Sequence, residues 1–267
     1  MKYIVIALAA GLAGAPSYAQ DVVKPFTVSG SVGLVSDYRF RGVSQSDKEM
    51  AVQGGATITH VSGFYGGFWG SNLAGWGQFG GSNMELDLIG GYKKSFGGAT
   101  VDVGLTWYMY PGGSDLTDFA EPYVKVSTTA GPVNLLAGVA YAPKQKALGN
   151  FSNTPQSRGQ SQDNLYIWGD ASAGIPGTPV TLKAHAGYSH GNPGLGPNGT
   201  SVTPTGEYFD YSIGADYVLG PLILGISYVD TNITKKESLY LQPNFSSSKN
   251  GSSIASGRAV FAITAVF

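Results

Sequence analysis

Charged and aromatic residues alternate over a short stretch near the start of the chain. Asp37, Arg39 and Arg41 share one parity, and Tyr38 and Phe40 share the other. On an extended strand, residues of one parity point to the same face. We therefore expect the three charged side chains to line one face of the upper end of the first predicted strand, where their chemistry would be the selection of solutes by charge.

Further charged residues fall on a single parity of later segments. Their mixed signs predict a network of ion pairs across an enclosed space, with at most mild charge selectivity. Two interpretations stay open for these residues and for the trio at 37–41. They form either a constriction that selects solutes or a salt-bridged plug that stabilises a narrow interior. The candidates are Glu85, Asp87, Lys93, Asp102, Glu121, Lys125, Asp170, Lys183, Asp210 and Asp216.

Strands are needed to position these side chains, and an alternation of period two continues after residue 25. One parity is mostly apolar, and the other is mostly small or polar, as in strands that face lipid on one side and a lumen on the other. The pattern predicts about twelve strands, near residues 26–34, 52–59, 64–73, 84–89, 101–108, 121–126, 133–139, 165–170, 180–186, 209–217, 222–228 and 259–267. The segment 64–73 is apolar on both faces, so its orientation stays unassigned.

The links between these strands alternate between short and long. Links such as 61–63 and 219–221 are short, whereas 143–163 and 231–255 are long. Short periplasmic turns and long extracellular loops are typical of bacterial outer-membrane barrels. The sequence therefore predicts an all-β fold, a closed antiparallel transmembrane β-barrel with both chain ends on the periplasmic side.

Composition agrees with an exported membrane protein. Only 12% of the residues are charged, Gly is abundant and Cys is absent, whereas soluble domains carry about 25% charged residues. Residues 1–19 have the basic start, short apolar run and small residues of a signal peptide. We expect residues 20–267 to form the barrel in the cell outer membrane. No later apolar run is long enough for a spanning helix.

Aromatic residues near the predicted strand ends favour a membrane girdle, with a sugar-binding slide as the alternative. The girdle candidates are Tyr38, Phe40, Trp107 and Tyr228. The last residue, Phe267, follows apolar residues at every second position, and we predict that it is the signal read by the outer-membrane insertion machinery.

The stretch from Val35 to Ser46, VSDYRFRGVSQS, resembles the TorF family of outer-membrane porins. The blocks at 53–55, 60–72 and 84–92 are similar to the family's next segments, and the resemblance is closest over residues 26–142. It implies a barrel and, through the family's name, transport. It carries no catalytic residues.

No motif of an enzyme is present: G-x-S-x-G, H-E-x-x-H and phosphate-loop patterns are all missing. His60, His185 and His190 are scattered, so no metal or other cofactor is expected, and the net charge of −1 offers no surface for nucleic acid. The leading hypothesis is a porin-like channel for passive diffusion of small hydrophilic solutes, held in outer-membrane lipid. The alternative is a structural or adhesive barrel with an occluded lumen.

Overall fold

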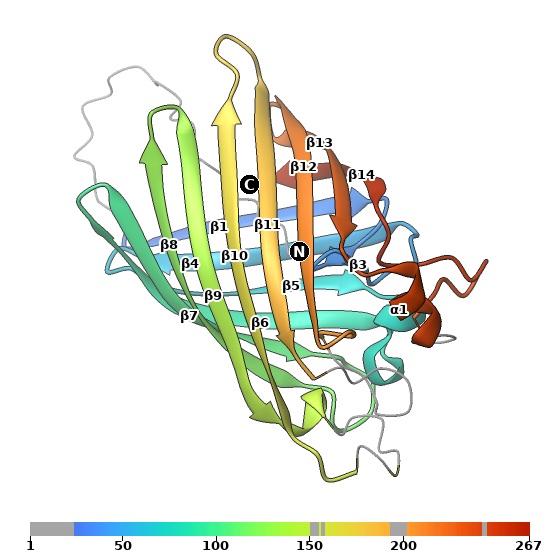
Figure 1. The fold of residues 1–267 in the computed structure, drawn as a ribbon. Helices are drawn as coiled ribbons and strands as arrows, with labels where there is room; N and C mark the ends of the chain where they lie inside the picture. The colour runs from blue at the N-terminus through green and yellow to red at the C-terminus, as the bar shows by residue number, and fades with distance from the viewer. Residues whose placement is uncertain (1–23, 150–154, 156–157, 193–201, 242–244) are drawn as a thin grey trace, which may run out of the picture.

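The computed structural model describes residues 24–149, 155, 158–192, 202–241 and 245–267. The predicted signal peptide lies outside these residues. Twelve of the described strands form one closed antiparallel barrel (Figure 1), which confirms the predicted fold class and strand number. They are β1 (Phe26–Val35), β4 (Ala51–His60), β5 (Phe64–Asn72), β6 (Met84–Phe96), β7 (Ala99–Met109), β8 (Phe119–Ala130), β9 (Val133–Gln145), β10 (Gln162–Gly174), β11 (Val180–Gly191), β12 (Glu207–Leu219), β13 (Leu222–Thr231) and β14 (Arg258–Val266).

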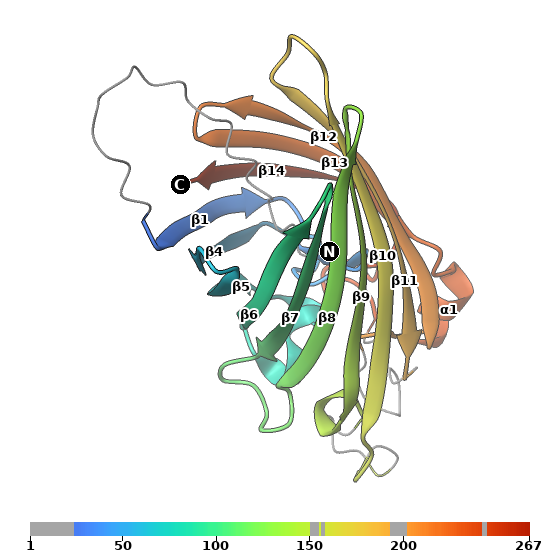
Figure 2. The same cartoon turned by 90° about the vertical axis from the view of Figure 1, so that its left-hand side faces the viewer.

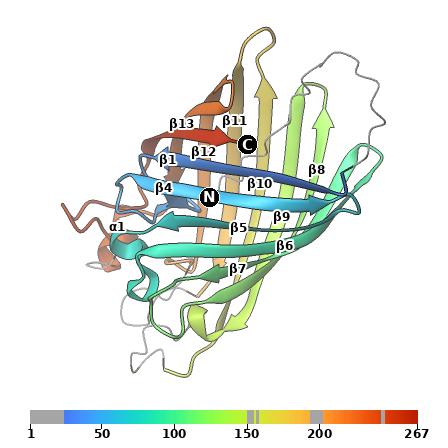
Figure 3. The same cartoon turned by 180° about the vertical axis from the view of Figure 1, so that it is seen from behind.

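The barrel closes where its first strand meets its last. β1 and β14 run side by side (Figures 2 and 3), with register from Ser31↔Val266 to Val35↔Ala262. Beyond this pairing, Phe267 and Gly30 exchange two backbone hydrogen bonds of 2.8 and 3.0 Å. Closure satisfies backbone groups that an open sheet edge would leave unpaired.

Connections alternate in length as predicted. The short ones are 61–63, 97–98, 131–132, 175–179 and 220–221, and the long ones are 36–50, 73–83, 110–118, 146–161, 192–206 and 232–257. We call the two rims of the barrel the short-turn end and the long-loop end. Both the start of β1 and Phe267 lie at the short-turn end.

The outer face of the barrel is apolar. Side chains such as Val28, Phe68, Leu88, Ile213 and Ile263 are exposed there, Ile213 by 67%. The orientation of β5 is also settled, because Phe64 and Phe68 face outward while Tyr65 and Trp69 face inward. Such an apolar surface around a closed sheet is what lipid contact requires.

Helical structure is confined to short pieces in the long loops. The described pieces are α1 (Lys235–Tyr240), η1 (Gly75–Gly77), η2 (Phe79–Gly81) and η3 (Lys146–Leu148). Among the described residues, no helix has the length and apolar character needed to cross a membrane. A capping box between Thr234 and Glu237 starts α1.

One long connection departs from the prediction. Strand β1 ends at Val35, and residues 36–50, which we call the plug segment, leave the barrel wall and enter the lumen. There they form a small hairpin of β2 (Arg39–Phe40) and β3 (Val43–Ser44). The girdle prediction for Tyr38 and Phe40 is therefore wrong. Tyr38 is only 2% exposed, and Phe40 packs against interior clusters.

Candidate functional site

The plug segment is held in shape by its own polar side chains. Asp37 accepts hydrogen bonds from Arg39 Nε at 2.7 Å and from Ser44 Oγ at 2.6 Å. Arg39 also donates to the carbonyls of Gly42 at 2.8 Å and Ser256 at 3.1 Å. Each of these contacts joins a charged group to a partner inside the barrel, which offsets the cost of removing the charge from water.

The tip of the plug segment is a two-residue turn. Arg39 pairs with Ser44 and Phe40 pairs with Val43, so the turn residues are Arg41 and Gly42. Both have positive φ, 47° and 78°, as a type I′ hairpin turn requires. Gly42 is also needed for space, because a Cβ there would collide with Thr231 and lie 2.9 Å from the Cβ of Asp210.

Arg41 reaches across the lumen to the opposite wall. Its guanidinium lies 2.6 Å from Glu121 on β8 and 2.7 Å from Asn164 on β10. It also lies over the Tyr166 ring, 4.1 Å from the centroid. Burial disfavours its charge, but the attraction of Glu121 outweighs this, so the pKa of Arg41 is raised. The side chain is a permanent buried cation.

Tyr38 fastens the plug segment to another strand. Its hydroxyl donates to both carboxylate oxygens of Glu85 on β6 at 3.2 Å, and its ring packs against Trp69 with centroids 5.3 Å apart. Burial, reinforced by the negative Glu85, raises the pKa of Tyr38 well above its usual range. The phenol therefore remains a neutral donor.

A second group of buried polar residues lies beside the side chains that bind Arg41. His185 on β11 bridges two carboxylates, Asp170 at 2.6 Å and Asp210 at 3.1 Å. Tyr166 contacts both His185, at 2.9 Å, and Asp210, at 3.1 Å. Asn164, Tyr166 and His185 were not among the lumen-lining candidates predicted from the sequence. Tyr166 and His185 do have the inward parity of their strands, which is the signal that could have identified them.

Apolar side chains from the long loops cover the plug segment. One cluster combines Val43 with Tyr208, Ile233, Phe245 and Ile254. A hollow of about 20 Å³ lies beside the plug segment, bordered by Phe40, Trp76, Glu85 and Tyr110 among others. The described side chains thus fill the long-loop half of the lumen.

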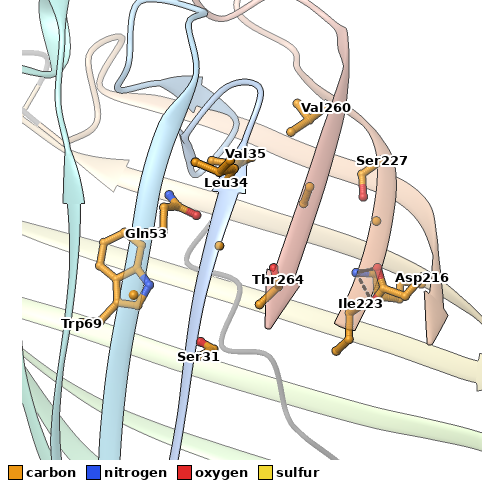
Figure 4. A pocket seen from close by; sticks show the side chains of 15 residues that line it. Ser31, Leu34, Val35, Gln53, Trp69, Asp216, Ile223, Ser227, Val260 and Thr264 are labelled. Atoms are coloured by element: carbon orange, nitrogen blue, oxygen red, sulfur yellow. Dashed lines mark hydrogen bonds and ion pairs between the residues drawn. The ribbon is translucent and has the colours of Figure 1, made fainter. Parts of the chain in front are cut away.

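The short-turn half of the lumen is open by comparison. Lys125 pairs with Asp102 at 3.0 Å and Lys183 with Asp216 at 2.6 Å, and all four side chains keep contact with solvent. Ser31, Gln53, Trp69, Asp216 and Thr264 border a hollow of about 80 Å³ there (Figure 4). These side chains come from β1, β4, β5, β12 and β14, so the hollow lies next to the seam that closes the barrel.

The structure places the sequence candidates at two levels of the lumen. Asp37, Arg39 and Arg41 are buried on the plug segment, not on β1 as expected. Glu85, Asp87, Glu121 and Asp210 are buried on the wall around it, and Asp102, Lys125 and Lys183 lie in the open half. Trp107 and Tyr228 are exposed on the outer face. Phe267 is 73% exposed at the short-turn end, and its role as insertion signal stays a prediction.

In the described ranges, no group of three or more His, Cys, Asp or Glu side chains is arranged to hold a metal ion. The bridged His185 uses both ring nitrogens for its carboxylate partners, so neither nitrogen is open to a metal.

Comparison with protein families gives one match over almost the whole chain. The model described as "Bacterial protein of unknown function (Gcw_chp)" matches residues 19–267. No curated protein matches the sequence.

Solved structures resemble the fold at very low sequence identity. A protein from a study of the in-meso crystallization of membrane proteins has a TM-score of 0.50 at 7% identity, over 90% of this chain and 83% of that chain. A porin refined at 1.8 Å has a TM-score of 0.44 at 10% identity, over 91% and 100%. An outer membrane channel from Pseudomonas putida F1 has a TM-score of 0.42 at 9% identity, over 95% and 100%. At such identities, similarity is one of fold alone.

Proposed function

The chain belongs to the Gcw_chp family of bacterial proteins of unknown function, and from its geometry we propose that it is a plugged outer-membrane channel. The channel allows passive diffusion of small hydrophilic solutes when the plug segment leaves the lumen. One observation carries this proposal. The interior is a polar lumen whose long-loop half holds one connection between strands, residues 36–50, with side chains of other long loops packed over it.

The surroundings of the barrel follow from its surface. The exposed apolar outer face supports contact with outer-membrane lipid, and the terminal Phe267 supports recognition by the outer-membrane insertion machinery. The short-turn end would then face the periplasm and the long-loop end the exterior. The resemblance to TorF porins belongs to the same proposal, as does the absence of an enzymatic activity, a cofactor and nucleic-acid binding.

A filled lumen also favours a second candidate, a structural or adhesive barrel that never conducts. Its support is the number of buried contacts around Arg41 and Tyr38. The two candidates differ in what happens when the plug segment is removed. A channel should gain conductance, whereas a structural barrel should remain without conductance.

The barrel offers a clean way to remove the plug. Val35 on β1 and Ala51 on β4 are register partners, so residues 36–50 can be replaced by Asn-Gly, which favours a type I′ hairpin turn. We expect this variant to show single-channel conductance at least about tenfold above that of the wild type, because the lumen of a twelve-strand barrel is wider than that of a filled eight-strand barrel. A folded, inserted variant with no conductance would contradict the channel and favour the structural barrel.

A further inference from the structure

The wall around the plug segment is negatively charged. Glu85 and Asp87 on β6, Glu121 on β8 and Asp210 on β12 are all buried. In the described part of the chain, the buried Lys and Arg side chains are Arg39 and Arg41, and both belong to the plug segment. The wall therefore supplies carboxylates. Of the two buried cations of the plug segment, Arg41 pairs with one of them, Glu121, whereas Arg39 pairs with Asp37 of the plug segment itself.

The hydrogen-bond partners of the Arg41 guanidinium are wall residues, and the ring of Phe40 on the plug segment also lies beside it, with the centroid 4.8 Å away. Glu121 provides a carboxylate, Asn164 an amide oxygen and Tyr166 the face of an aromatic ring. Tyr108 on β7 donates to the other oxygen of Glu121 at 3.0 Å, which fixes the orientation of the carboxylate. A carboxylate, a neutral acceptor and a π face are the groups that recognise a planar guanidinium.

The backbone at Arg41 is poorly suited to an arginine. Its φ of 47° lies in the left-handed region, which costs an L-residue about 1–2 kcal/mol and is normally left to Gly or Asn. The side-chain contacts on the wall offset that cost. The strained turn thus places the guanidinium group of Arg41 in a pocket of the barrel wall.

We propose that the wall pocket formed by Glu121, Asn164 and Tyr166 is a binding site for a small solute that carries a guanidinium group, and that Arg41 occupies it as a tethered competitor. Such a solute would enter through the open short-turn half and displace Arg41. Displacement would release the tip of the plug segment and leave the acidic wall facing the lumen. This step rests on the proposed channel function, whereas binding to the pocket does not.

Chemical rescue tests the pocket without any transport measurement. In Arg41→Ala, the pocket loses its occupant and the barrel in detergent should unfold at a lower temperature. Millimolar guanidinium chloride should restore at least about half of the loss in a saturable way, because a ligand that binds only the folded state stabilises it. Sodium chloride at equal ionic strength should not. The wild type, whose pocket is occupied, should show no such gain.

Two variants make the result specific. Arg41→Ala combined with Glu121→Gln removes the carboxylate of the pocket and should abolish the rescue. Lys183→Ala removes a lumen cation from the open half, where Lys183 and Asp216 retain solvent contact, and should show no saturable rescue. Equal rescue in all variants, or none in Arg41→Ala, would overturn the pocket. If Arg41→Ala does not fold, Arg41→Lys replaces it, since the free guanidinium should then compete with a lysine that lacks the planar fork.

Recordings from the wild type in planar bilayers separate the pocket from the channel. At concentrations above those that rescue Arg41→Ala, guanidinium should displace the tethered Arg41 and raise the open probability, and sodium at the same concentrations should not. Rescue without conductance would keep the pocket and reject the channel. Conductance in the plug-deleted barrel without rescue of Arg41→Ala would keep the channel and reject the pocket.

Discussion

Two ion pairs of equal length lie in the two halves of the lumen and differ in their surroundings. Arg41 and Glu121 are 2.6 Å apart with side chains 4% and 4% exposed. Lys183 and Asp216 are also 2.6 Å apart, with 31% and 20% exposure. The first pair is enclosed by the plug segment and the long loops, and the second faces the open half. The two pairs therefore differ in the free energy lost when one partner is removed, because water screens the Lys183–Asp216 pair and is excluded from the Arg41–Glu121 pair.

The same contrast extends to what the charges can do. In the open half, an ion pair can hydrate, exchange partners and leave space for a solute. In the filled half, buried charges such as Arg41 and Asp37 are held by fixed partners, and through Arg41 the plug segment and the wall stabilise each other. A movement of residues 36–50 would therefore change the long-loop half far more than the short-turn half.

The largest effect should come from breaking the buried pair. Glu121→Gln leaves the guanidinium of Arg41 buried without its carboxylate, which costs about 3–5 kcal/mol when no relaxation occurs. We expect either a marked fall in the unfolding temperature in detergent or release of the plug segment with a gain of conductance. Thermal unfolding followed by circular dichroism, together with bilayer recordings, distinguishes the two responses.

The matched control is Asp216→Asn in the open half. Its pair has the same length but is partly hydrated, so the expected loss is about 0–1 kcal/mol. Conductance should also stay near the wild-type level. Losses of similar size in the two variants would show that the plug segment does not exclude water from Arg41, and the comparison between the two halves would fail.

A smaller effect is expected at the tip of the plug segment. Gly42→Ala places a Cβ against Thr231 and Asp210 at a φ of 78°, and should destabilise the plugged state by about 1–3 kcal/mol. Gly112→Ala is the natural comparison, since Gly112 has a φ of 77° but no atom within 4 Å of the added Cβ.

Both glycine variants carry the same backbone strain, so their difference isolates the contact with the wall. Gly42→Ala should raise channel open probability, and Gly112→Ala should not. Unfolding temperatures measured side by side give the energetic part. If both variants lose the same stability and neither conducts more, the close approach of the hairpin tip to β12 and β13 is not what holds the plug.

The sequence predicts the barrel wall well and the plug poorly, for a physical reason. Period-two alternation is a local property, so it identifies the inward parity of Glu85, Asp87 and Glu121. The stretch from Asp37 to Arg41 alternates in the same way and was therefore predicted to extend β1. In the structure it turns back at Gly42 and forms a hairpin of its own. A short hairpin and a strand extension share one local pattern, and only contacts with distant strands distinguish them.

The partners of Arg41 illustrate the same limit. Glu121, Asn164 and Tyr166 lie far along the chain on β8 and β10, and their convergence depends on barrel closure and strand register. No spacing in the sequence encodes the distance across the lumen. The girdle prediction for Tyr38 failed for the same reason. Its aromatic side chain fits a membrane girdle, but the sequence does not show that the ring contacts Trp69 and the hydroxyl donates to Glu85 inside the barrel.

The last expected effect concerns pH and tests the burial of Tyr38 in the long-loop half of the lumen. Burial and the negative Glu85 raise the pKa of its phenol above the ordinary value of 10.0. In the unfolded chain, Tyr38 loses its proton near pH 10, while in the folded barrel it keeps the proton to higher pH. The unfolded state is therefore the one favoured as pH rises above 10, and stability falls by up to about 1.4 kcal/mol per pH unit from this group alone. Below pH 10 its contribution is fully present.

Tyr38→Phe has no proton to lose, so its unfolding temperature should decline less steeply than that of the wild type between pH 10 and 11.5. Parallel slopes in that window would mean that Tyr38 ionises as readily in the barrel as in water, and that the long-loop half is more hydrated than the buried contact with Glu85 implies.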